Sequence, residues 1–434
     1  MTGAKLPTAT VGRRSFLRTS FAIAVAAPLL SACGALEPQA GAGGTAEQGK
    51  KFLLSFDALD IDFYVQWEKL GKEAAEELGL DYSKAVSNYD VSTQRAAFEN
   101  AMTQGFDAVG MTAADEGASA SLIKLLTDSG ILVVNNGTNA PWSTPFDIGP
   151  NHISYMTPDN YLGAAAVARL LFTKMGGKGK LVHIEGVRGL SHDTERTLAV
   201  DAVLKEFPGI ELVARQPGNY SRVDAQAATE DILNSRSDVK GIFVQNDDGA
   251  LGVLNALRNY GSKVFVTGID GMPEMLDKIG SGEALATWVQ DPGYQAGTQA
   301  VLLYDALNGW KPRTPERMLM PGTFIIDTPE SAKLYKEKMF GTGKAYDWKK
   351  MSKTLNPEGR DLQNLLIPIN PEEFWARRKD EMPDGYVLAE EYAASKKSGE
   401  WDEVVTEYAE AFKTDPFKDV RAATNYGGAI IGQG

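Results

Sequence analysis

The sequence contains very little cysteine and histidine, and these shortages exclude several kinds of protein. Cys33 is the single cysteine, so the chain can form neither an internal disulfide nor a cysteine-rich metal site. The three histidines, His152, His183 and His192, are spread too thinly to favour a zinc centre. Phosphate-binding loops and nucleophile-elbow motifs are missing from the sequence as well. We therefore expect no metal, no cofactor and no catalytic residue, and a protein that is not an enzyme.

Long apolar runs and positive charge are also scarce. After residue 32 no segment is long and apolar enough to span a bilayer, so we expect a soluble body. Aspartate and glutamate number 57 against 44 lysines and arginines, which gives a formal net charge of −13. Such an acidic chain repels phosphate backbones, which argues against nucleic-acid binding. Its 434 residues are enough for two or three domains.

The N-terminus has the pattern of an export signal. The pair Arg13-Arg14 precedes an apolar run over 21–30 and the sequence Leu-Ser-Ala that ends at Cys33. This order of basic, apolar and small residues is typical of a secretory signal, here 1–32. The arginine pair resembles a twin-arginine motif, and the residues before Cys33 resemble a lipoprotein cleavage box. The alternative is a plain signal peptide with a coincidental cysteine. We expect lipidation of Cys33, a flexible tether over 33–50, and a periplasmic or cell-surface location in which only the lipid anchor touches the membrane.

From residue 51 the chain alternates between short apolar runs and longer amphipathic stretches. The apolar runs predict strands over 52–56, 108–112, 131–135, 180–185, 210–215, 241–244, 264–269 and 285–289. The stretches between them predict helices over 64–78, 92–104, 118–128, 161–175, 194–207, 225–235, 249–259 and 295–307. This alternation is typical of α/β folds with parallel sheets that helices cover on both faces. It occurs twice, which predicts two similar doubly wound lobes.

From residue 328 the composition changes. Proline recurs, β-branched runs almost vanish, and the periodicity over 388–412 is helical. We expect a mainly helical C-terminal extension over 329–434, of which the glycine-rich end, 426–434, is disordered.

Polar residues follow the predicted strands, where ligands bind in open α/β sheets. The runs are Gln245-Asn246-Asp247-x-x-Ala-Leu-Gly252, Gly268-Ile-Asp270-Gly271 and Gln290-Asp291-Pro292. In order and spacing they resemble those of the type I periplasmic sugar-binding proteins, the ribose- and galactose-binding group. The resemblance covers about 51–326. It implies a hinge of three crossings between a first lobe, 51–157 plus 291–322, and a second lobe, 158–290 plus 323–328.

The resemblance also implies which residues contact the ligand. Phe63 and Tyr64 would wall the site from the first lobe and Tyr220 from the second. Arg196 would donate to adjacent hydroxyls, and Asp57 would accept from one. The full set that it implies is Asp57, Phe63, Tyr64, Asn136, Arg196, Tyr220, Asn246, Asp270 and Gln290. Hydroxyl-rich ligands require such amides, carboxylates and aromatic faces.

The sequence departs from the family pattern after the strand at 131–135. Members of the family often have an aspartate there, sometimes followed by arginine. This chain has Asn135-Asn136-Gly137 and then Thr138-Asn-Ala-Pro-Trp142. The first-lobe half of the site is therefore chemically different, which leaves room for a linear or branched polyol.

Structural roles are open for several of these residues. Asp247 and Asp270 follow strands and precede helices, where aspartate commonly caps; we expect capping for Asp247 and ligand binding for Asp270. Trp67 is expected in the core.

The resulting functional hypothesis is the solute-binding component of an ABC importer. It would act as a monomer that binds a sugar or polyol and docks on permease subunits. The alternatives are a sensor of a non-sugar signal molecule and a carbohydrate-active hydrolase.

Overall fold

The computed structural model describes residues 49–236, 238–258, 263–426 and 428–431. The expected export signal and Cys33 lie outside these residues. The chain divides into two compact units, 1–48 and 49–434, and everything below concerns the second unit. Within the described residues, no helix is both long and apolar enough to cross a membrane.

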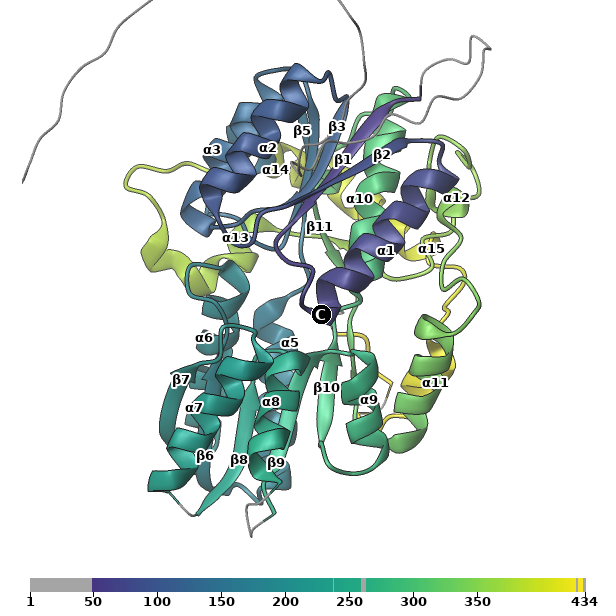
Figure 1. The fold of residues 1–434 in the computed structure, drawn as a ribbon. Coiled ribbons are helices and arrows are strands. Elements are labelled where there is room, and N and C mark those ends of the chain that lie inside the picture. Colours follow the sequence, from purple (N-terminus) through teal and green to yellow (C-terminus); the bar gives the residue numbers. More distant parts are fainter. Residues whose placement is uncertain (1–48, 237, 259–262, 427, 432–434) are drawn as a thin grey trace, which may run out of the picture. The chain divides into compact units, whose positions relative to one another are not determined.

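Two sheets form the centre of the two lobes (Figure 1). The strands are β1 (Lys51–Phe56), β2 (Asp81–Val86), β3 (Ala108–Thr112), β4 (Leu132–Asn136), β5 (His152–Met156), β6 (Lys178–Glu185), β7 (Gly209–Pro217), β8 (Val239–Val244), β9 (Phe265–Asp270), β10 (Ala286–Val289), β11 (Met318–Pro321), β12 (Phe324–Ile326) and β13 (Leu366–Pro368). Their order is β13-β11-β5-β4-β3-β1-β2 in the first sheet and β12-β10-β9-β8-β6-β7 in the second. Neighbouring strands are parallel, except that β12 and β13 run antiparallel to β10 and β11.

Helices cover both faces of each sheet. Those of the two lobes are α1 (Asp62–Glu77), α2 (Val91–Thr103), α3 (Glu116–Thr127), α4 (Pro145–Ile148), α5 (Asn160–Lys174), α6 (Ser191–Glu206), α7 (Arg222–Ser235), α8 (Asp247–Leu257), α9 (Pro273–Gly280) and α10 (Pro292–Leu307), with the short helix η1 (Thr314–Arg317) after them. Apolar strands that are buried on both faces require this double cover; every residue of β3, for example, is buried. The predicted pair of doubly wound lobes is confirmed.

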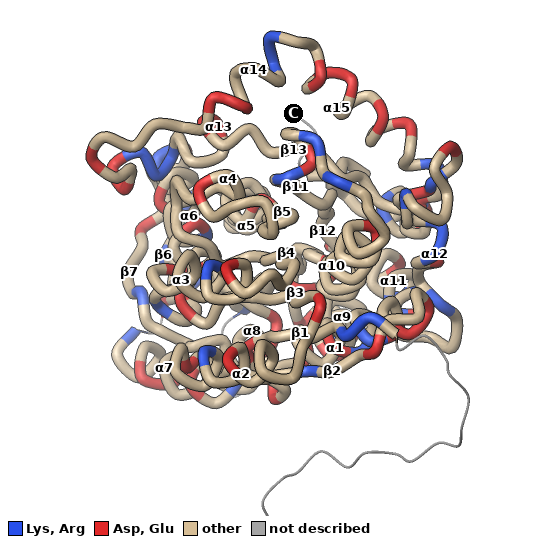
Figure 2. The backbone as a smooth tube through the Cα atoms, turned by 90° about the horizontal axis from the view of Figure 1, so that it is seen from above, with Lys and Arg blue, Asp and Glu red and all other residues tan. Residues whose placement is uncertain are grey.

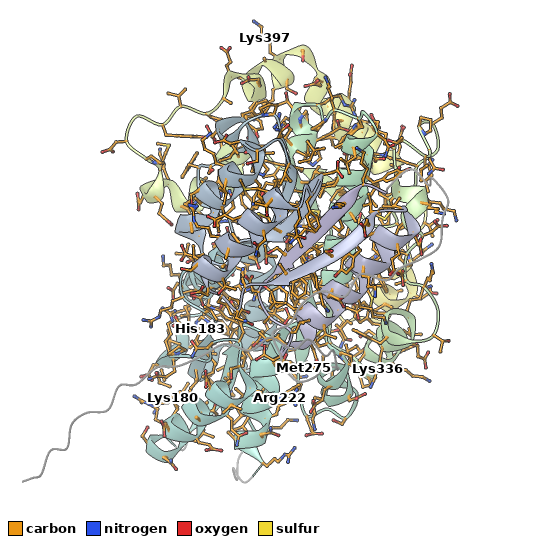
Figure 3. All side chains as sticks on the ribbon, turned by 45° about the horizontal axis from the view of Figure 1, so that its top comes forward. Lys180, His183, Arg222, Met275, Lys336 and Lys397 are labelled. Atoms are coloured by element: carbon orange, nitrogen blue, oxygen red, sulfur yellow. The ribbon has the colours of Figure 1, made fainter. Side chains whose placement is uncertain are left out.

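The sequence did not predict the strands β2, β5, β11, β12 and β13. The residues of β2, Asp-Tyr-Ser-Lys-Ala-Val, lie at the edge of the first sheet and are at most half-buried, so they form no apolar run. In β5, His152 and Ser154 interrupt the apolar pattern although both are buried. His183 in β6 is fully buried, as expected of a core residue (Figure 3).

The C-terminal extension contains α11 (Pro329–Phe340), α12 (Trp348–Met351), α13 (Pro371–Phe374), η2 (Ala376–Glu381), α14 (Glu390–Ser398), α15 (Glu400–Glu410) and α16 (Lys418–Ala422). The expected helix over 388–412 is two helices, because Gly399 takes a left-handed conformation (φ 86°) between them. Acidic side chains are frequent along α14 and α15 (Figure 2).

The end of the extension departs from the expected disorder. Ile431 pairs with Thr323, donating to its carbonyl at 2.7 Å, and Ile430 is buried. These two β-branched residues anchor the glycine-rich tail by apolar contact. The high glycine content of the tail gave no indication of this contact.

Before the extension the chain passes between the sheets three times, and the extension, which itself returns to the first sheet at β13, contacts each of these three segments. Arg377 forms an ion pair with Asp159 at 3.0 Å, next to the first segment. The hydroxyl of Tyr346 donates to Asp291 in the second. Ile431 pairs with Thr323 in the third. The extension is thus packed against the connections between the lobes.

Candidate functional site

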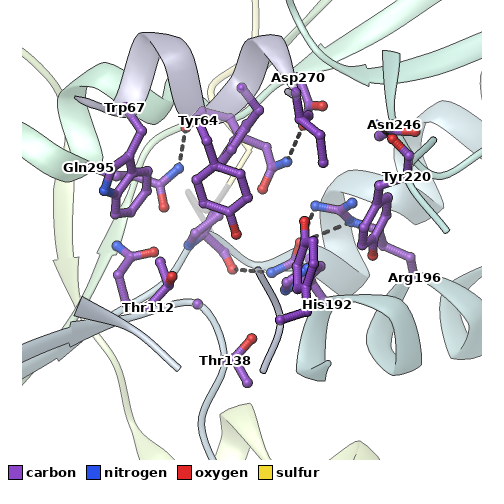
Figure 4. A pocket seen from close by; sticks show the side chains of 18 residues that line it. Tyr64, Trp67, Thr112, Thr138, His192, Arg196, Tyr220, Asn246, Asp270 and Gln295 are labelled. Carbon is purple, nitrogen blue, oxygen red and sulfur yellow. Dashed lines mark hydrogen bonds between the residues drawn. The ribbon is translucent and has the colours of Figure 1, made fainter. Parts of the chain in front are cut away.

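A buried pocket lies between the carboxyl ends of the two sheets (Figure 4). Its cavity measures about 60 Å³. This is room for about four to six water-sized groups, so the pocket suits a small solute and not an oligosaccharide. The residues that line it are Ile61, Phe63, Tyr64, Trp67, Tyr89, Thr112, Asn136, Gly137, Thr138, Pro158, Asn160, His192, Arg196, Tyr220, Asn246, Asp270, Gln290 and Gln295.

The structure brings most of the predicted site residues together in this pocket. Those that line it are Phe63, Tyr64, Asn136, Arg196, Tyr220, Asn246, Asp270 and Gln290. Asp57 does not line the pocket; its carboxylate is fully buried and accepts hydrogen bonds from Tyr64 (2.8 Å), Ser87 (2.7 Å) and Thr112 (2.9 Å). The expected contact between Asp57 and a ligand is therefore wrong for this conformation, because three hydroxyls of the protein occupy its oxygens.

The first turn of α1 supplies aromatic walls. The rings of Phe63 and Tyr64 meet edge to face at 5.1 Å, and Trp67 lies 5.9 Å from Phe63. Tyr89 adds a further ring, 6.5 Å from Tyr64. Trp67 was expected in the core; it is 1% exposed and packs there, but it also lines the pocket.

The segment after β4 supplies uncharged polar groups. Asn136 ends β4, and Gly137 and Thr138 follow it into the pocket. The amide nitrogen of Asn136, the hydroxyl of Thr138 and the indole nitrogen of Trp67 are buried without a hydrogen-bond partner among the described residues. Buried polar atoms are rarely left unpaired in proteins, because each costs about 1–3 kcal/mol.

The second lobe supplies the single arginine of the pocket. Arg196 on α6 donates from Nε and Nη2 to Asn160 Oδ1 (3.1 and 2.9 Å) and from Nη1 to the Gln245 carbonyl (2.6 Å). These bonds fix the guanidinium, which lies 5.9 Å from the centre of the Tyr220 ring. His192 also lines the pocket, with its ring 5.5 Å from that of Tyr220.

Asp270 is held at the end of β9 in a strained conformation. Its φ of 131° is unusual for a residue other than glycine, and such strain is common at binding sites. Gln290 donates to its Oδ1 at 2.8 Å. Asp247 accepts from the backbone nitrogens of Gly271 and Met272, both at 2.7 Å, and so fixes the turn after Asp270. The expectation that Asp247 caps α8 is wrong, because Asn246 is the cap and accepts from Gly249 at 2.9 Å.

Burial controls the charges of the pocket. It raises the pKa of Asp270 well above its ordinary value, and the neighbouring Asp247 adds to this rise. Burial, helped by Arg196, lowers the pKa of His192 well below its ordinary value, so the imidazole is neutral. Among the described residues that line the pocket, Arg196 is thus the one cation and Asp270 the one acid, and burial favours the neutral form of that acid.

Sequence reasoning missed Tyr89, Thr112, Thr138, Asn160, His192 and Gln295. An internal repeat could have revealed Tyr89. Asn88-Tyr89 in the first lobe and Asn219-Tyr220 in the second are the same dipeptide, each before a helix and each in a left-handed conformation with φ between 51° and 57°. Nothing local distinguishes Thr138 or His192 from surface residues.

The two lobes contact each other around the pocket, so the cleft is closed. Asp62 donates from its backbone to Asp248 at 3.2 Å on one side. On the other side the hydroxyl of Ser191 accepts from the backbone of Asn139 (3.0 Å) and donates to Glu116 (2.6 Å).

This chain is similar to known proteins both in sequence and in fold. The family model described as "periplasmic binding protein domain" matches residues 52–311. A xylitol-binding protein of Mycolicibacterium smegmatis is 27% identical over 286 residues, which cover 65% of this chain and 79% of that protein. A ribose import binding protein of Bacillus subtilis is 26% identical, and the match covers 65% of this chain and 90% of that protein. The crystal structure of a Caulobacter myo-inositol binding protein bound to myo-inositol has a TM-score of 0.59 and 25% identity, with 67% of this chain and 97% of that chain covered.

Proposed function

This chain belongs to the periplasmic binding protein family, and on that premise we propose that it is the solute-binding component of an ABC importer. It would capture one small, uncharged sugar or polyol between its lobes and deliver it to membrane permease subunits. Members of the family are transport binding proteins, not enzymes, and we propose the same of this chain.

The observation that carries the proposal is the set of unpaired polar atoms in the pocket wall. The nitrogens of Asn136 and Trp67 and the hydroxyl of Thr138 are buried in a closed cleft without a hydrogen-bond partner among the residues that the structure describes. A hydroxylated solute would supply those partners. Aromatic faces at Phe63 and Tyr220 suit the C–H faces of such a molecule.

Two features narrow the class of solute: the ionisable side chains of the pocket, and Asn136 at a position where members of the family often have an aspartate. Hydroxyl groups can accept from Arg196 and can pair with Asp270 whether its carboxyl is protonated or ionised, so an uncharged, hydroxylated solute suits both side chains. No carboxylate follows β4, so the first lobe recognises its end of the solute with an amide and a hydroxyl. The xylitol-binding relative is named for a linear polyol, which supports including this class among the candidates.

Capture would involve a hinge motion. We propose that the first lobe (51–157 plus 291–322) moves against the second lobe (158–290 plus 323–328), as the family resemblance implies. The closed form would then dock on the permease. Export by the signal at 1–32, lipidation of Cys33, the tether at 33–50 and a monomeric state belong to the same proposal.

The test is a binding screen of the purified protein. Pentoses, hexoses, inositols and short linear polyols are added in a thermal-shift assay, and affinities are then measured by calorimetry. A bound solute at 100 times its Kd should stabilise the protein by about 2.7 kcal/mol. A binding protein returns the solute unchanged, whereas a hydrolase would not.

Two variants test the site itself. Arg196→Ala and Asp270→Ala each remove a buried charged group and should weaken binding by about 100-fold or more. Lys205→Ala, an exposed change on the same helix as Arg196, is the control and should bind like the wild type. Absence of any shift across the panel, or full affinity in both variants, would refute the proposal.

A further inference from the structure

One loop connects the binding pocket to the C-terminal extension. It begins at Thr138, which lines the pocket, and ends at Trp142, which is 8% exposed. The ring of Trp142 lies 6.0 Å from that of Trp375, and its indole nitrogen donates to the carbonyl of Arg378 at 3.0 Å. Both partners lie in the extension, outside the stretch that the family model matches.

Hydrogen bonds make the middle of this loop rigid. The side chain of Asn139 accepts from Asn135 (3.2 Å) and donates to the carbonyls of Ala140 (3.0 Å) and Ser143 (2.8 Å). The backbone of Ala140 donates to Ser119 at 2.9 Å. A displacement at Trp142 is therefore transmitted along the loop to Thr138 instead of being absorbed between them.

A second path leads from the extension to the same loop. Arg378 is 3% exposed and donates through both terminal nitrogens to Glu116, each at 2.7 Å. Glu116 in turn accepts from Ser191, whose hydroxyl accepts from the backbone of Asn139. Arg378 thus fixes a carboxylate that holds the loop closed over the pocket.

The conformation of Trp142 shows why the loop needs these anchors. Its φ of 59° is left-handed, which is unfavourable for a residue with a side chain. A tertiary anchor must hold it there: the rings that face Trp142 and its indole hydrogen bond come from the extension, within a buried cluster that Tyr155 and Met318 of the first lobe complete.

We propose that the extension selects the solute: Trp375 and Arg378 act as positioning residues that hold the loop from Thr138 to Trp142 and so fix the first-lobe face of the pocket. This inference rests on the proposed function. None of Trp142, Trp375 and Arg378 lines the cavity, so their effect on recognition is indirect. Solutes that bond to Thr138 lose more affinity on release of the loop than solutes that do not.

The experiment compares variants of the full purified protein. Trp375→Ala removes the anchor, Trp142→Phe keeps a smaller aromatic ring but loses the indole hydrogen bond to Arg378, and Trp375→Phe keeps an aromatic ring as a conservative rescue. Phe340→Ala is the matched control, because Phe340 is a half-buried ring of the same extension that packs on Tyr335, in a different cluster from Trp142. Affinities for xylitol, D-ribose, D-allose and myo-inositol are measured by calorimetry. Hydrogen exchange of the peptide 137–143 is followed by mass spectrometry.

The expected result has two parts. Exchange over 137–143 rises by about 10-fold or more in Trp375→Ala and less in Trp142→Phe, and it stays at the wild-type rate in Phe340→Ala. The ratio of affinities between the best and second-best solutes falls by about 5-fold or more in Trp375→Ala and returns toward the wild-type ratio in Trp375→Phe.

Two results would overturn the inference. One is unchanged exchange over 137–143 in both Trp375→Ala and Trp142→Phe. The other is an equal loss of affinity for every solute, which would indicate a hinge effect and not selection. If the wild type binds none of the four solutes nor any of the wider panel, the proposed function fails. Exchange over 137–143 then decides alone whether the extension holds the loop.

Discussion

The hydroxyl of Tyr64 donates to Asp57 at 2.8 Å behind the wall of the pocket. The same carboxylate accepts from Thr112, another lining residue, and from Ser87. Burial raises the pKa of Asp57, and the three hydrogen bonds oppose this rise. Asp57 therefore holds two lining side chains in place and need not touch a solute itself.

Replacement of Asp57 by alanine should lower stability more than an ordinary surface change. Asp57→Ala leaves three hydroxyls without their acceptor, so we expect the free energy of unfolding to fall by about 2–4 kcal/mol. Urea denaturation measures it. Asp60→Ala, an exposed change nearby, should stay within about 0.5 kcal/mol of the wild type. Equal stabilities for the two variants would show that the hydroxyls find other partners.

Most of the two-lobed body could be predicted from the sequence because its strands are apolar and its helices are periodic. The edge strand β2 could not, since half-buried polar residues give no such pattern. Residues directly after strands, such as Asp270 and Gln290, could be placed at the cleft because parallel strands end at one edge. Asp57 shows the limit: only the folded chain brings Tyr64, Ser87 and Thr112 onto its oxygens.

Thr138 could not be predicted for a different reason. Its place depends on a loop whose anchor, Trp375, lies more than two hundred residues later in the chain. No local propensity encodes such a contact. The unusual sequence from Thr138 to Trp142 was visible, but its partner was not.

Gly186 lies directly against the ring of Tyr220, and a methyl group there would overlap that ring. Tyr220 is 5% exposed and stands between His192 and Arg196, so it must move into the pocket or the turn must shift. Overpacking of this kind costs about 1–3 kcal/mol. We expect Gly186→Ala to weaken solute binding by about 10-fold or more in calorimetry.

The control for this variant is Gly280→Ala. Gly280 lies in α9 with no heavy atom close to the added methyl group, so this change should leave binding at the wild-type level. Wild-type affinity in Gly186→Ala would mean that Tyr220 does not wall the occupied site.

Tyr346 of the extension donates to Asp291 in the second connection between the lobes. Tyr346→Phe removes the hydroxyl and leaves a buried carboxylate with one donor fewer, the remaining bond coming from the backbone of Tyr294 at 2.9 Å. We expect a loss of about 1–3 kcal/mol in urea denaturation. Tyr304→Phe is the control, since its hydroxyl forms no hydrogen bond to another described residue. A loss equal to that of the control would mean that water replaces Tyr346 at no cost.

Stability should depend on pH through buried carboxyls whose pKa is raised in the folded protein, Asp57 and Asp270 among them. Burial raises the pKa of Asp193 to about 6, that of Glu195 to about 7 and that of Asp291 to about 6. The folded protein therefore binds more protons than the unfolded chain between the ordinary values, 3.8 and 4.5, and these raised values. By linkage, stability falls as the pH rises through this window.

In acid, stability changes with pH in the opposite direction and falls as the pH falls. Hydrogen bonds from Lys353 and Arg313 lower the pKa of Glu407 against the opposing effect of burial, and its stabilising contribution is lost as the pH falls through that lowered value.

We therefore expect maximal stability near pH 5, and a decrease of about 1–3 kcal/mol per raised group by pH 7.5. Urea denaturation at pH 5.0 and 7.5 measures it. Glu195→Gln removes one of the groups, so it should reduce the difference between the two values. A wild-type protein that is more stable at pH 7.5 than at pH 5.0 would show that these carboxyls are ionised in the fold; for Glu195, the charges of Arg377 and Arg378 would then outweigh burial.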